Sequence, residues 1–360
     1  MISSVYVHIP FCRRKCKYCT FASYPELDLI EQYISALIDE IKARYNCELI
    51  KTLYIGGGTP SLLDASHISK IVSCFKFDAK SEITCEANPE NLPLSKLIDL
   101  KKAGINRLSF GVQAFDDNLL FLIGRRHSVK DAISSIDNAR TAGFQNINID
   151  LIYGLPTQTM ADFASSVIVA CELEVPHISS YGLKIEEGAY FYSHLPENLP
   201  DEDAQADMYL KLIEITEKYG YSHYEISNFA KPDFQSIHNL NYWNAENYYG
   251  FGCAACGYEE NLRYSHQKSI KKYIENPTFL TEQELLSPQI QLEEIIFLGL
   301  RKSEGINISE INEKFNIDFE SKYSDILKKY KEYFVNTKNG IAFTNEGFLI
   351  SNCILSEFTE

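Results

Sequence analysis

Short apolar runs alternate with longer segments of helical period over the first 220 residues. The runs are rich in β-branched and aromatic residues, and in the segments between them apolar positions recur every three or four residues. This alternation is typical of parallel strands joined by crossover helices. The predicted strands are Val5–Ile9, Thr52–Ile55, Glu82–Ala87, Arg107–Val112, Asn146–Tyr153 and His177–Leu183. The predicted helices are Leu27–Tyr45, Asp64–Phe75, Pro93–Ala103, Val129–Ala142, Met160–Leu173 and Glu202–Tyr219.

Several predicted strands end in glycine or polar residues. Ile55 runs into three glycines, and later strands end at or near Glu86, Gln113 and Asp150. In a parallel barrel the chemistry lies where the strands end. Six βα units are too few to close an eight-stranded barrel, so we expect an α/β fold with an open partial (βα)6 TIM-like barrel. A flat, doubly wound sheet is the alternative. An open side would admit a large ligand.

The pattern changes at about residue 221. The next stretch is rich in aromatic residues and asparagine and holds the only tryptophan, Trp243. We interpret residues 221–287 as a segment that caps a barrel of residues 1–220. After Pro288, three segments of helical period precede a predicted hairpin at Lys338–Gly340. Residues 288–360 are therefore predicted to form a small winged-helix-like α+β domain. Its helices are predicted at Gln289–Leu300, Ser309–Phe315 and Tyr323–Phe334.

Charge changes the expected partners. The chain has 34 Lys and Arg against 49 Asp and Glu, a formal net charge of −15, which opposes a sequence-independent grip on nucleic acid. The acidic excess extends to residues 288–360, so we expect a packing or partner role there rather than DNA binding. No stretch reaches the roughly 18 apolar residues of a membrane span, and the N-terminus lacks a signal-peptide pattern. We expect a soluble, cytoplasmic protein with no nucleic-acid partner and no transmembrane segment.

Three cysteines follow the first predicted strand. Cys12, Cys16 and Cys19 form a C-x3-C-x2-C run. Three thiolates on one loop can each bind one iron of a [4Fe-4S] cluster and leave the fourth iron open. A zinc knuckle completed by His8 is the alternative, but zinc sites of this kind usually have a second cysteine pair. Basic neighbours are expected to lower the pKa of the thiols. These neighbours are Arg13, Arg14, Lys15 and Lys17.

The cysteine loop belongs to a series of segments that spans about the first 260 residues. In order, the segments read HIPFCRRKCKYCTFASY, YIGGGTPS, EANPE, GINRLSFGVQAFDDNLLFLIGRRH, NINIDLIYGLPTQT, HISSYGLKIEEG, YEISNFAKP and HNLNYW. With this series the chain resembles the oxygen-independent coproporphyrinogen oxidase group of the radical S-adenosylmethionine proteins. A lone glycine triplet or a lone Tyr-Trp pair would not carry the resemblance.

The resemblance implies a [4Fe-4S] cluster on the three cysteines and S-adenosylmethionine chelated to the open iron. It places Tyr6 against the adenosyl group and brings the backbone at the glycines close to the methionine end. Arg125 is expected to pair with a carboxylate, and Glu86 or Asp150 to accept from ribose hydroxyls. Taken singly, each polar residue also fits a satisfied structural role. The full set of expected S-adenosylmethionine contacts is Tyr6, Gly57, Gly58, Thr59, Glu86, Gln113, Arg125 and Asp150.

Two functions lie within this group. The oxidases have a fourth cysteine where this chain has Phe21, and they have a longer segment before the cysteine loop. HNLNYW supplies an imidazole, His238, that could bind heme iron beside the aromatic faces of Tyr242 and Trp243, and a core histidine is the alternative. The resemblance therefore implies a heme chaperone that binds heme and delivers it to acceptor hemoproteins. Oxidase activity, the radical decarboxylation of propionates, is the alternative and is not expected. A radical enzyme acting on tRNA is disfavoured by the charge.

One segment departs from the group. It reads GFGCAACGY, with Cys256 where the group usually has histidine. A thiolate can also bind heme iron, but we favour the interpretation that Cys253 and Cys256 are small buried residues of a tight loop. The resemblance is also compatible with a homodimer.

Overall fold

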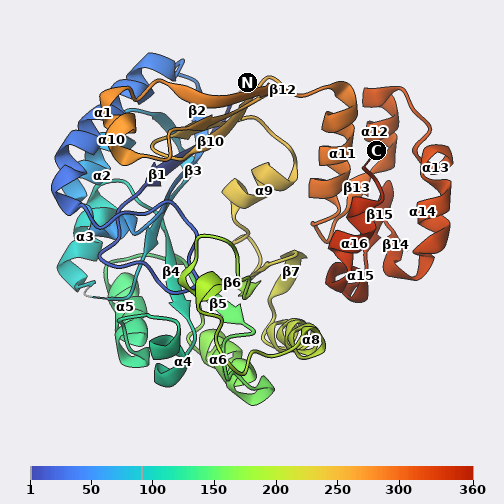
Figure 1. The fold of residues 1–360 in the computed structure, drawn as a ribbon, viewed down its shortest axis with the longest axis horizontal. Coiled ribbons are helices and arrows are strands. Elements are labelled where there is room, and N and C mark those ends of the chain that lie inside the picture. The colour runs from blue at the N-terminus through green and yellow to red at the C-terminus, as the bar shows by residue number, and fades with distance from the viewer. Residues whose placement is uncertain (1, 91, 360) are drawn as a thin grey trace.

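The structure is a computed structural model that describes residues 2–90 and 92–359. Its first six strands are mutually parallel and lie side by side in chain order. Sequential order with helices on the outside of a curved sheet is the arrangement of a barrel, not of a doubly wound sheet (Figure 1). The predicted partial barrel is therefore confirmed. The six strands are β1 (Ser4–Ile9), β2 (Leu49–Gly57), β3 (Lys76–Ala87), β4 (Arg107–Gln113), β5 (Asn146–Tyr153) and β6 (His177–Gly182).

The crossover helices bury one apolar face against the sheet, and two of them begin at capping boxes. The side chains of Ser128 and Thr159 accept from Asp131 N–H and Asp162 N–H, and each aspartate returns a bond to its cap, which fixes the starts of two helices. Each predicted crossover helix is present. They are α1 (Ile30–Arg44), α2 (Ala65–Val72), α3 (Leu94–Lys102), α5 (Val129–Thr141), α6 (Met160–Glu172) and α8 (Glu202–Lys218). The short α4 (Asp117–Leu122) and α7 (Tyr190–Ser193) were not predicted.

Residues 221–287 extend this sheet at both ends. On one side β8 (Asn228–Ala230) pairs antiparallel with β6, and β7 (Ser222–Glu225) pairs with β8. On the other side β9 (Tyr248–Phe251) pairs parallel with β1. Beyond β9 follow the antiparallel strands β10 (Cys256–Glu259), β11 (Leu262–His266) and β12 (Leu280–Leu285). Strands from both sides of residue 220 share one sheet, so the sheet does not mark a domain boundary there. The predicted boundary stays a prediction.

One short helix lies inside the curve of the sheet. Figure 1 shows α9 (Ile237–Trp243) there, surrounded by strands on three sides. Its first turn is held by Glu82 of β3, whose carboxylate accepts from the backbone N–H groups of Ile237 and His238. The buried acid thus satisfies two of the amide groups that every helix start leaves without an internal partner. Outside the sheet, α10 (Ile270–Glu275) packs beside α1.

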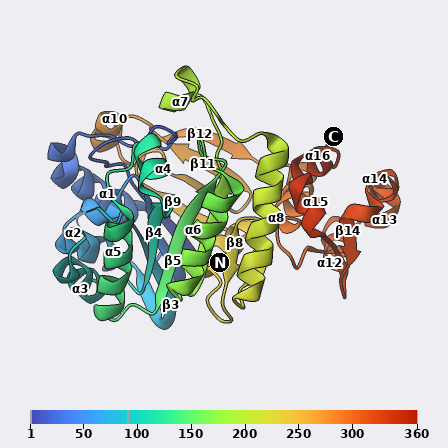
Figure 2. The same ribbon diagram turned by 90° about the horizontal axis from the view of Figure 1, so that it is seen from below.

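The C-terminal residues form a smaller unit beside the barrel (Figures 1 and 2). Its helices include α11 (Pro288–Gly299) and α12 (Ile308–Phe315), and the hairpin of β14 (Phe334–Asn336) and β15 (Gly340–Phe343) turns where the sequence predicted. Backbone bonds from Ile226 N–H to Arg301 and from Ser303 N–H to Tyr224 join it to the barrel. Its other elements are β13 (Ile306–Asn307), α13 (Phe319–Lys322), α14 (Ser324–Lys329), α15 (Asn345–Leu349) and α16 (Ser351–Ser356).

Over the residues that the structure describes, no helix is both long enough and apolar enough to cross a membrane.

Candidate functional site

A cavity of ≈ 370 Å³ opens at the carboxyl ends of the parallel strands. All three cysteines of the C-x3-C-x2-C run line it. So do all the predicted S-adenosylmethionine contacts except Tyr6. The cavity therefore gathers residues from the cysteine loop and from the ends of β2, β3, β4 and β5. Those predicted contacts are Gly57, Gly58, Thr59, Glu86, Gln113, Arg125 and Asp150.

The cysteine loop is fixed by backbone bonds at both ends. The N–H of Cys12 donates to Tyr24 at 3.0 Å, and the N–H of Lys17 donates to Ile123 at 3.0 Å. Within the loop, Cys19 N–H donates to Cys16 at 3.2 Å. The three thiols are therefore held around one cavity by the chain itself.

Cys12 and Cys19 do not have the lowered pKa values that the basic neighbours predicted. Burial is the largest influence on Cys12 and Cys19, and it raises the pKa of Cys12 and raises that of Cys19 to about 11. The charge of Lys15 lowers the pKa of Cys19 by less. That prediction was wrong because the charged side chains of Arg13, Arg14 and Lys15 extend into solvent, where their fields are screened.

The arrangement of the thiols fits a cluster better than a zinc ion. In residues 2–90 and 92–359, no three His, Cys, Asp or Glu side chains converge as a single metal ion requires. The proposed zinc ligand His8 is engaged at both ring nitrogens: Nε2 donates to Ala22 at 2.8 Å, and Nδ1 accepts from Tyr6 at 3.0 Å. A cubane holds its cysteine ligands on separate irons, so three thiols spread around one cavity suit it.

The glycine turn after β2 has space only for glycine. Gly57 has a φ of +114°, and a Cβ there would lie 2.6 Å from the His8 ring. A Cβ on Gly58 would lie 2.6 Å from the carbonyl oxygen of Phe11. Backbone from this turn therefore approaches the cysteine loop as closely as sterics permit. Thr59 follows, with Oγ1 at 3.2 Å from Cys12 Sγ.

Two buried carboxyl groups face the same cavity. Glu86 accepts from Tyr54 Oη and from Gly57 N–H, each at 2.9 Å. Burial and the charge of Asp150 raise the pKa of Glu86 to about 7. Burial also raises the pKa of Asp150, which accepts from Asn148 Nδ2 at 2.7 Å. Such a pair favours a ligand that brings hydroxyl donors or positive charge, since either one compensates the buried carboxylates.

Among the described residues, Arg125 bonds to an amide, a carbonyl and a thiol, and its predicted pairing with a carboxylate stays a prediction. It donates to Asn88 Oδ1 at 2.8 Å, to the carbonyl of Gly111, and to Cys16 Sγ at 3.5 Å. Its Nε is buried and has no hydrogen-bond partner within the described part of the chain. The guanidinium instead joins the cysteine loop to the strand ends, because the amide of Asn88 and the carbonyl of Gly111 both face it.

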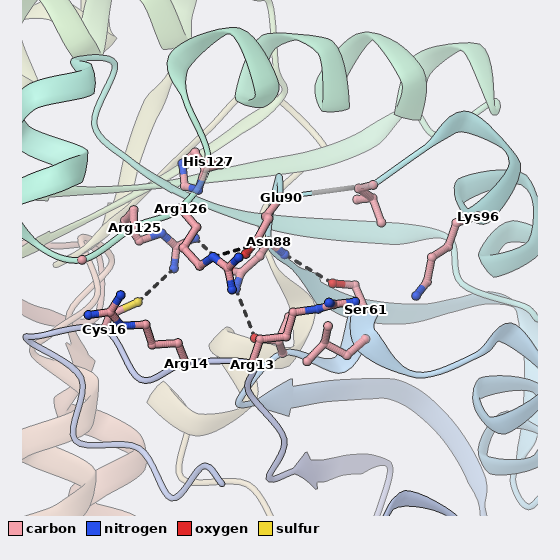
Figure 3. A pocket seen from close by; sticks show the side chains of 14 residues that line it. Arg13, Arg14, Cys16, Ser61, Asn88, Glu90, Lys96, Arg125, Arg126 and His127 are labelled. Atoms are coloured by element: carbon pink, nitrogen blue, oxygen red, sulfur yellow. Dashed lines mark hydrogen bonds and ion pairs between the residues drawn. The ribbon is translucent and has the colours of Figure 1, made fainter. Parts of the chain in front are cut away.

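A smaller basic pocket of ≈ 60 Å³ adjoins this cavity, and Cys16 and Arg125 line both (Figure 3). Arg126 is paired there with Glu90 at 3.2 Å. Asn88 and Thr59 also line both pockets, and Asn88 Nδ2 donates to Thr59 Oγ1 at 3.1 Å. The other cations that line this pocket are Arg13, Arg14 and Lys96.

Tyr6 lies below the cavity rather than in its wall. Its hydroxyl donates to His8, and its ring stacks on Tyr54 at a centroid distance of 6.2 Å. The predicted contact of Tyr6 with an adenosyl group stays a prediction.

The HNLNYW histidine is part of the barrel interior. His238 is 1% exposed, and its ring stacks on Tyr54 at 5.1 Å. Thr52 donates its hydroxyl to Ser4, so it accepts from His238 Nδ1 at 2.9 Å. Nε2 then accepts from Tyr242 Oη at 2.9 Å. Burial lowers the pKa of His238 to about 3. These contacts match the core-histidine alternative, and heme ligation by His238 stays a prediction that requires the bond at the ligating nitrogen, such as the one from Tyr242 to Nε2, to break.

The other heme-motif residues differ in exposure. Trp243 lines a groove of ≈ 800 Å³ between α9 and the C-terminal unit. Cys253 is buried, and its thiol donates to the carbonyl of Gln267 at 3.1 Å. Cys256 is exposed at the start of β10, so the expectation that both cysteines are buried was wrong for Cys256.

Sequence reasoning missed several residues of the site. Asn88 lies in the EANPE segment, but only its glutamate was selected. Arg107 was predicted only as a strand residue, yet its side chain is almost fully buried and its charge lowers the pKa of both Glu86 and Asp150. Asn148 was likewise assigned only to a strand. Polar residues at alternate positions of β4 and β5 were the available signal, because they point into the barrel.

Comparison with known proteins defines the class. Residues 6–167 match the Radical SAM superfamily, and residues 286–350 match the HemN C-terminal domain. The solved structure of coproporphyrinogen III oxidase (HemN) from Escherichia coli, described as a radical SAM enzyme, superposes with a TM-score of 0.86. It is 25% identical and covers 99% of this chain and 89% of its own. The fold and the thiol-lined cavity thus define a radical SAM protein.

Curated relatives identify the family. The heme chaperone HemW of Lactococcus lactis is 38% identical over 99% of this chain and 97% of its own length. That of Bacillus subtilis is 37% identical over 99% of both chains. The chain belongs to the HemW family.

Proposed function

We propose that this protein is a heme chaperone, which binds heme and delivers it to acceptor hemoproteins. The observation that carries the proposal is similarity to proteins named heme chaperone over 99% of the chain. A [4Fe-4S] cluster and S-adenosylmethionine would occupy the cavity at the strand ends. The acceptor, a homodimer and a cytoplasmic location stay predictions.

Cys12, Cys16 and Cys19 would hold the cluster, and the glycine turn would receive the methionine end of S-adenosylmethionine. When bound, a reduced cluster supplies one electron and an open coordination position. Glu86 and Asp150 would accept hydrogen bonds from ligand hydroxyls, since both carboxyls face the cavity. Arg125 would place positive charge beside the Cys16 thiolate and so offset the negative charge of a thiolate-bound cluster.

Phe21 supports the chaperone over the oxidase. It lines the mouth of the cavity, two residues after Cys19, and 64% of its surface is exposed. The oxidases have a fourth cysteine at this position, whereas phenylalanine offers an apolar surface and no thiol. The oxidase alternative rests on the close structural match to HemN.

Anaerobic incubation of cluster-loaded protein with reductant, S-adenosylmethionine and coproporphyrinogen III separates the two functions. Mass analysis of the porphyrin is expected to show unchanged coproporphyrinogen, while heme titration of the same preparation shifts the heme absorbance. Accumulation of protoporphyrinogen would make the protein an oxidase and overturn the proposal.

A further inference from the structure

Only one of the eight histidines in this chain is exposed. Six have buried rings, and His223 is half-buried, stacked on Phe229 at 4.7 Å with Nε2 at 3.2 Å from Tyr209 Oη. The exposed one is His194, which directly follows α7. An imidazole that binds a ligand without rearrangement of the fold must therefore come from His194. The six buried histidines are His8, His67, His127, His177, His238 and His266.

The contacts of His194 set its tautomer. Nδ1 lies 3.4 Å from the carbonyl oxygen of Tyr190 and 3.0 Å from Ser193 Oγ. Ser193 Oγ donates its hydrogen to the carbonyl oxygen of Tyr190 at 3.2 Å, so it accepts from Nδ1, which carries the ring hydrogen and leaves Nε2 its lone pair. Histidines that bind metals commonly donate their other N–H in this way. Among the residues that the structure describes, no hydrogen-bond partner engages Nε2.

Stacking holds the ring in place without covering Nε2. The imidazole lies parallel to the Tyr190 ring, with centroids 4.2 Å apart and an interplanar angle of 1°. Stacking uses the face of the imidazole, whereas metal coordination uses the lone pair in its plane. The ring is therefore oriented in advance for coordination.

Large apolar side chains are exposed around this imidazole. Tyr190, Tyr192 and Leu195 are 52%, 58% and 70% exposed. Figure 2 shows that α7 projects from the barrel. The segment is tied to the cysteine loop, since Phe191 N–H donates to Lys17 at 2.9 Å. Clustered exposure of this kind marks a surface that another apolar body covers.

We propose that His194 is an axial ligand of heme iron, with the porphyrin covering the apolar side chains of α7. This inference rests on the proposed function. The hydrogen on Nδ1 leaves the Nε2 lone pair available for the iron. A porphyrin supplies the flat apolar face that Tyr192 and Leu195 would cover. Lys15 and Lys184, which line the neighbouring cavity, are the nearby cations that propionates could meet.

Heme titration of the cluster-loaded protein, followed by absorbance and electron paramagnetic resonance, tests the site. Wild type is expected to show an imidazole-ligated heme. His194→Ala should lose that signature and bind heme about 10-fold or more weakly, with iron and sulfide content of the cluster unchanged. Free imidazole added to His194→Ala should restore the spectrum. Ser193→Ala, which keeps the imidazole and its bond to Tyr190, is the matched control.

Two further variants, Cys256→Ser and His238→Gln, test whether the iron ligand lies elsewhere. If His194→Ala keeps the wild-type spectrum and affinity while Cys256→Ser or His238→Gln loses them, the iron ligand lies elsewhere and the inference is overturned. If the wild type itself binds no heme, the proposed function fails first, and this site fails with it. The wild-type titration therefore separates the two failures.

Discussion

The carboxylate of Glu86, at the end of β3, accepts a hydrogen bond from the backbone N–H of Gly57, at the end of β2, over 2.9 Å. This bond joins two adjacent strand ends and sets the glycine turn against the cysteine loop. Tyr54 Oη binds the other carboxylate oxygen of Glu86 at 2.9 Å, so the side chain is held on both sides. The S-adenosylmethionine site that we propose is therefore built into the sheet before a ligand arrives.

Gly57→Ala should abolish binding of S-adenosylmethionine. The substitution adds a Cβ 2.6 Å from the His8 ring and places alanine at a φ of +114°, which costs about 1–3 kcal/mol of backbone strain. Gly188→Ala is the control, because Gly188 also has a positive φ, +93°, but nothing lies within 4 Å of its added Cβ. Equilibrium dialysis and thermal unfolding measure both variants. Equal loss of binding in the two would show that contact with His8 plays no part.

Cys16→Ala should prevent stable cluster assembly, since a cubane would lose one of its three protein ligands. Iron content and charge-transfer absorbance after anaerobic reconstitution are the measurements. Cys47→Ala removes an exposed thiol away from the loop and should assemble the cluster normally. Unchanged iron in Cys16→Ala would contradict the ligand assignment.

Stability should fall as the pH rises from about 4.5 to 7, in part through Glu225. Burial raises its pKa from 4.5 to about 7, so in this range the folded protein keeps a proton that the unfolded chain has released. The corresponding loss is roughly 3 kcal/mol above pH 7. Urea unfolding across this range should show a shallower fall for Glu225→Gln than for wild type. The exposed substitution Glu202→Gln should leave the slope unchanged, and an equal slope in Glu225→Gln would refute the assignment.

His238→Phe should destabilise the barrel without changing heme binding. The phenylalanine leaves the hydroxyl groups of Thr52 and Tyr242 without their imidazole partner, a loss of about 2–3 kcal/mol. Chemical unfolding gives the stability, and heme titration gives the affinity. Ile237→Ser, on the same helix but exposed, should change neither. If a folded His238→Phe variant loses heme binding, His238 is the iron ligand and the assignment to His194 is wrong.

The parallel core was predictable because its signals are local. Strands β1 to β6 contain short buried apolar runs, and polar residues such as Glu86 in β3 and Asp150 in β5 lie near their carboxyl ends. The cysteine spacing likewise lies within eight residues. These features need no knowledge of distant contacts.

The rest of the site depends on contacts between distant segments. Helix α9 has only seven residues, which is too short to show a helical period in the sequence. Its place inside the barrel is set by contacts with Glu82 and Thr52. The partners of Arg125 come from two other strand ends, so its sequence neighbours could not reveal them. The pKa of Cys19 is raised by burial. The lysines near it in the sequence predicted a lowered pKa, because burial is not visible in the sequence.

Heme transfer is the most direct test of the central claim. Heme-loaded protein is mixed with the apo form of a b-type hemoprotein, and the absorbance of the acceptor is followed. The same loaded protein mixed with a passive heme scavenger gives the rate of spontaneous release. The account predicts transfer to the acceptor that is faster than release to the scavenger. Transfer no faster than release would contradict a chaperone function.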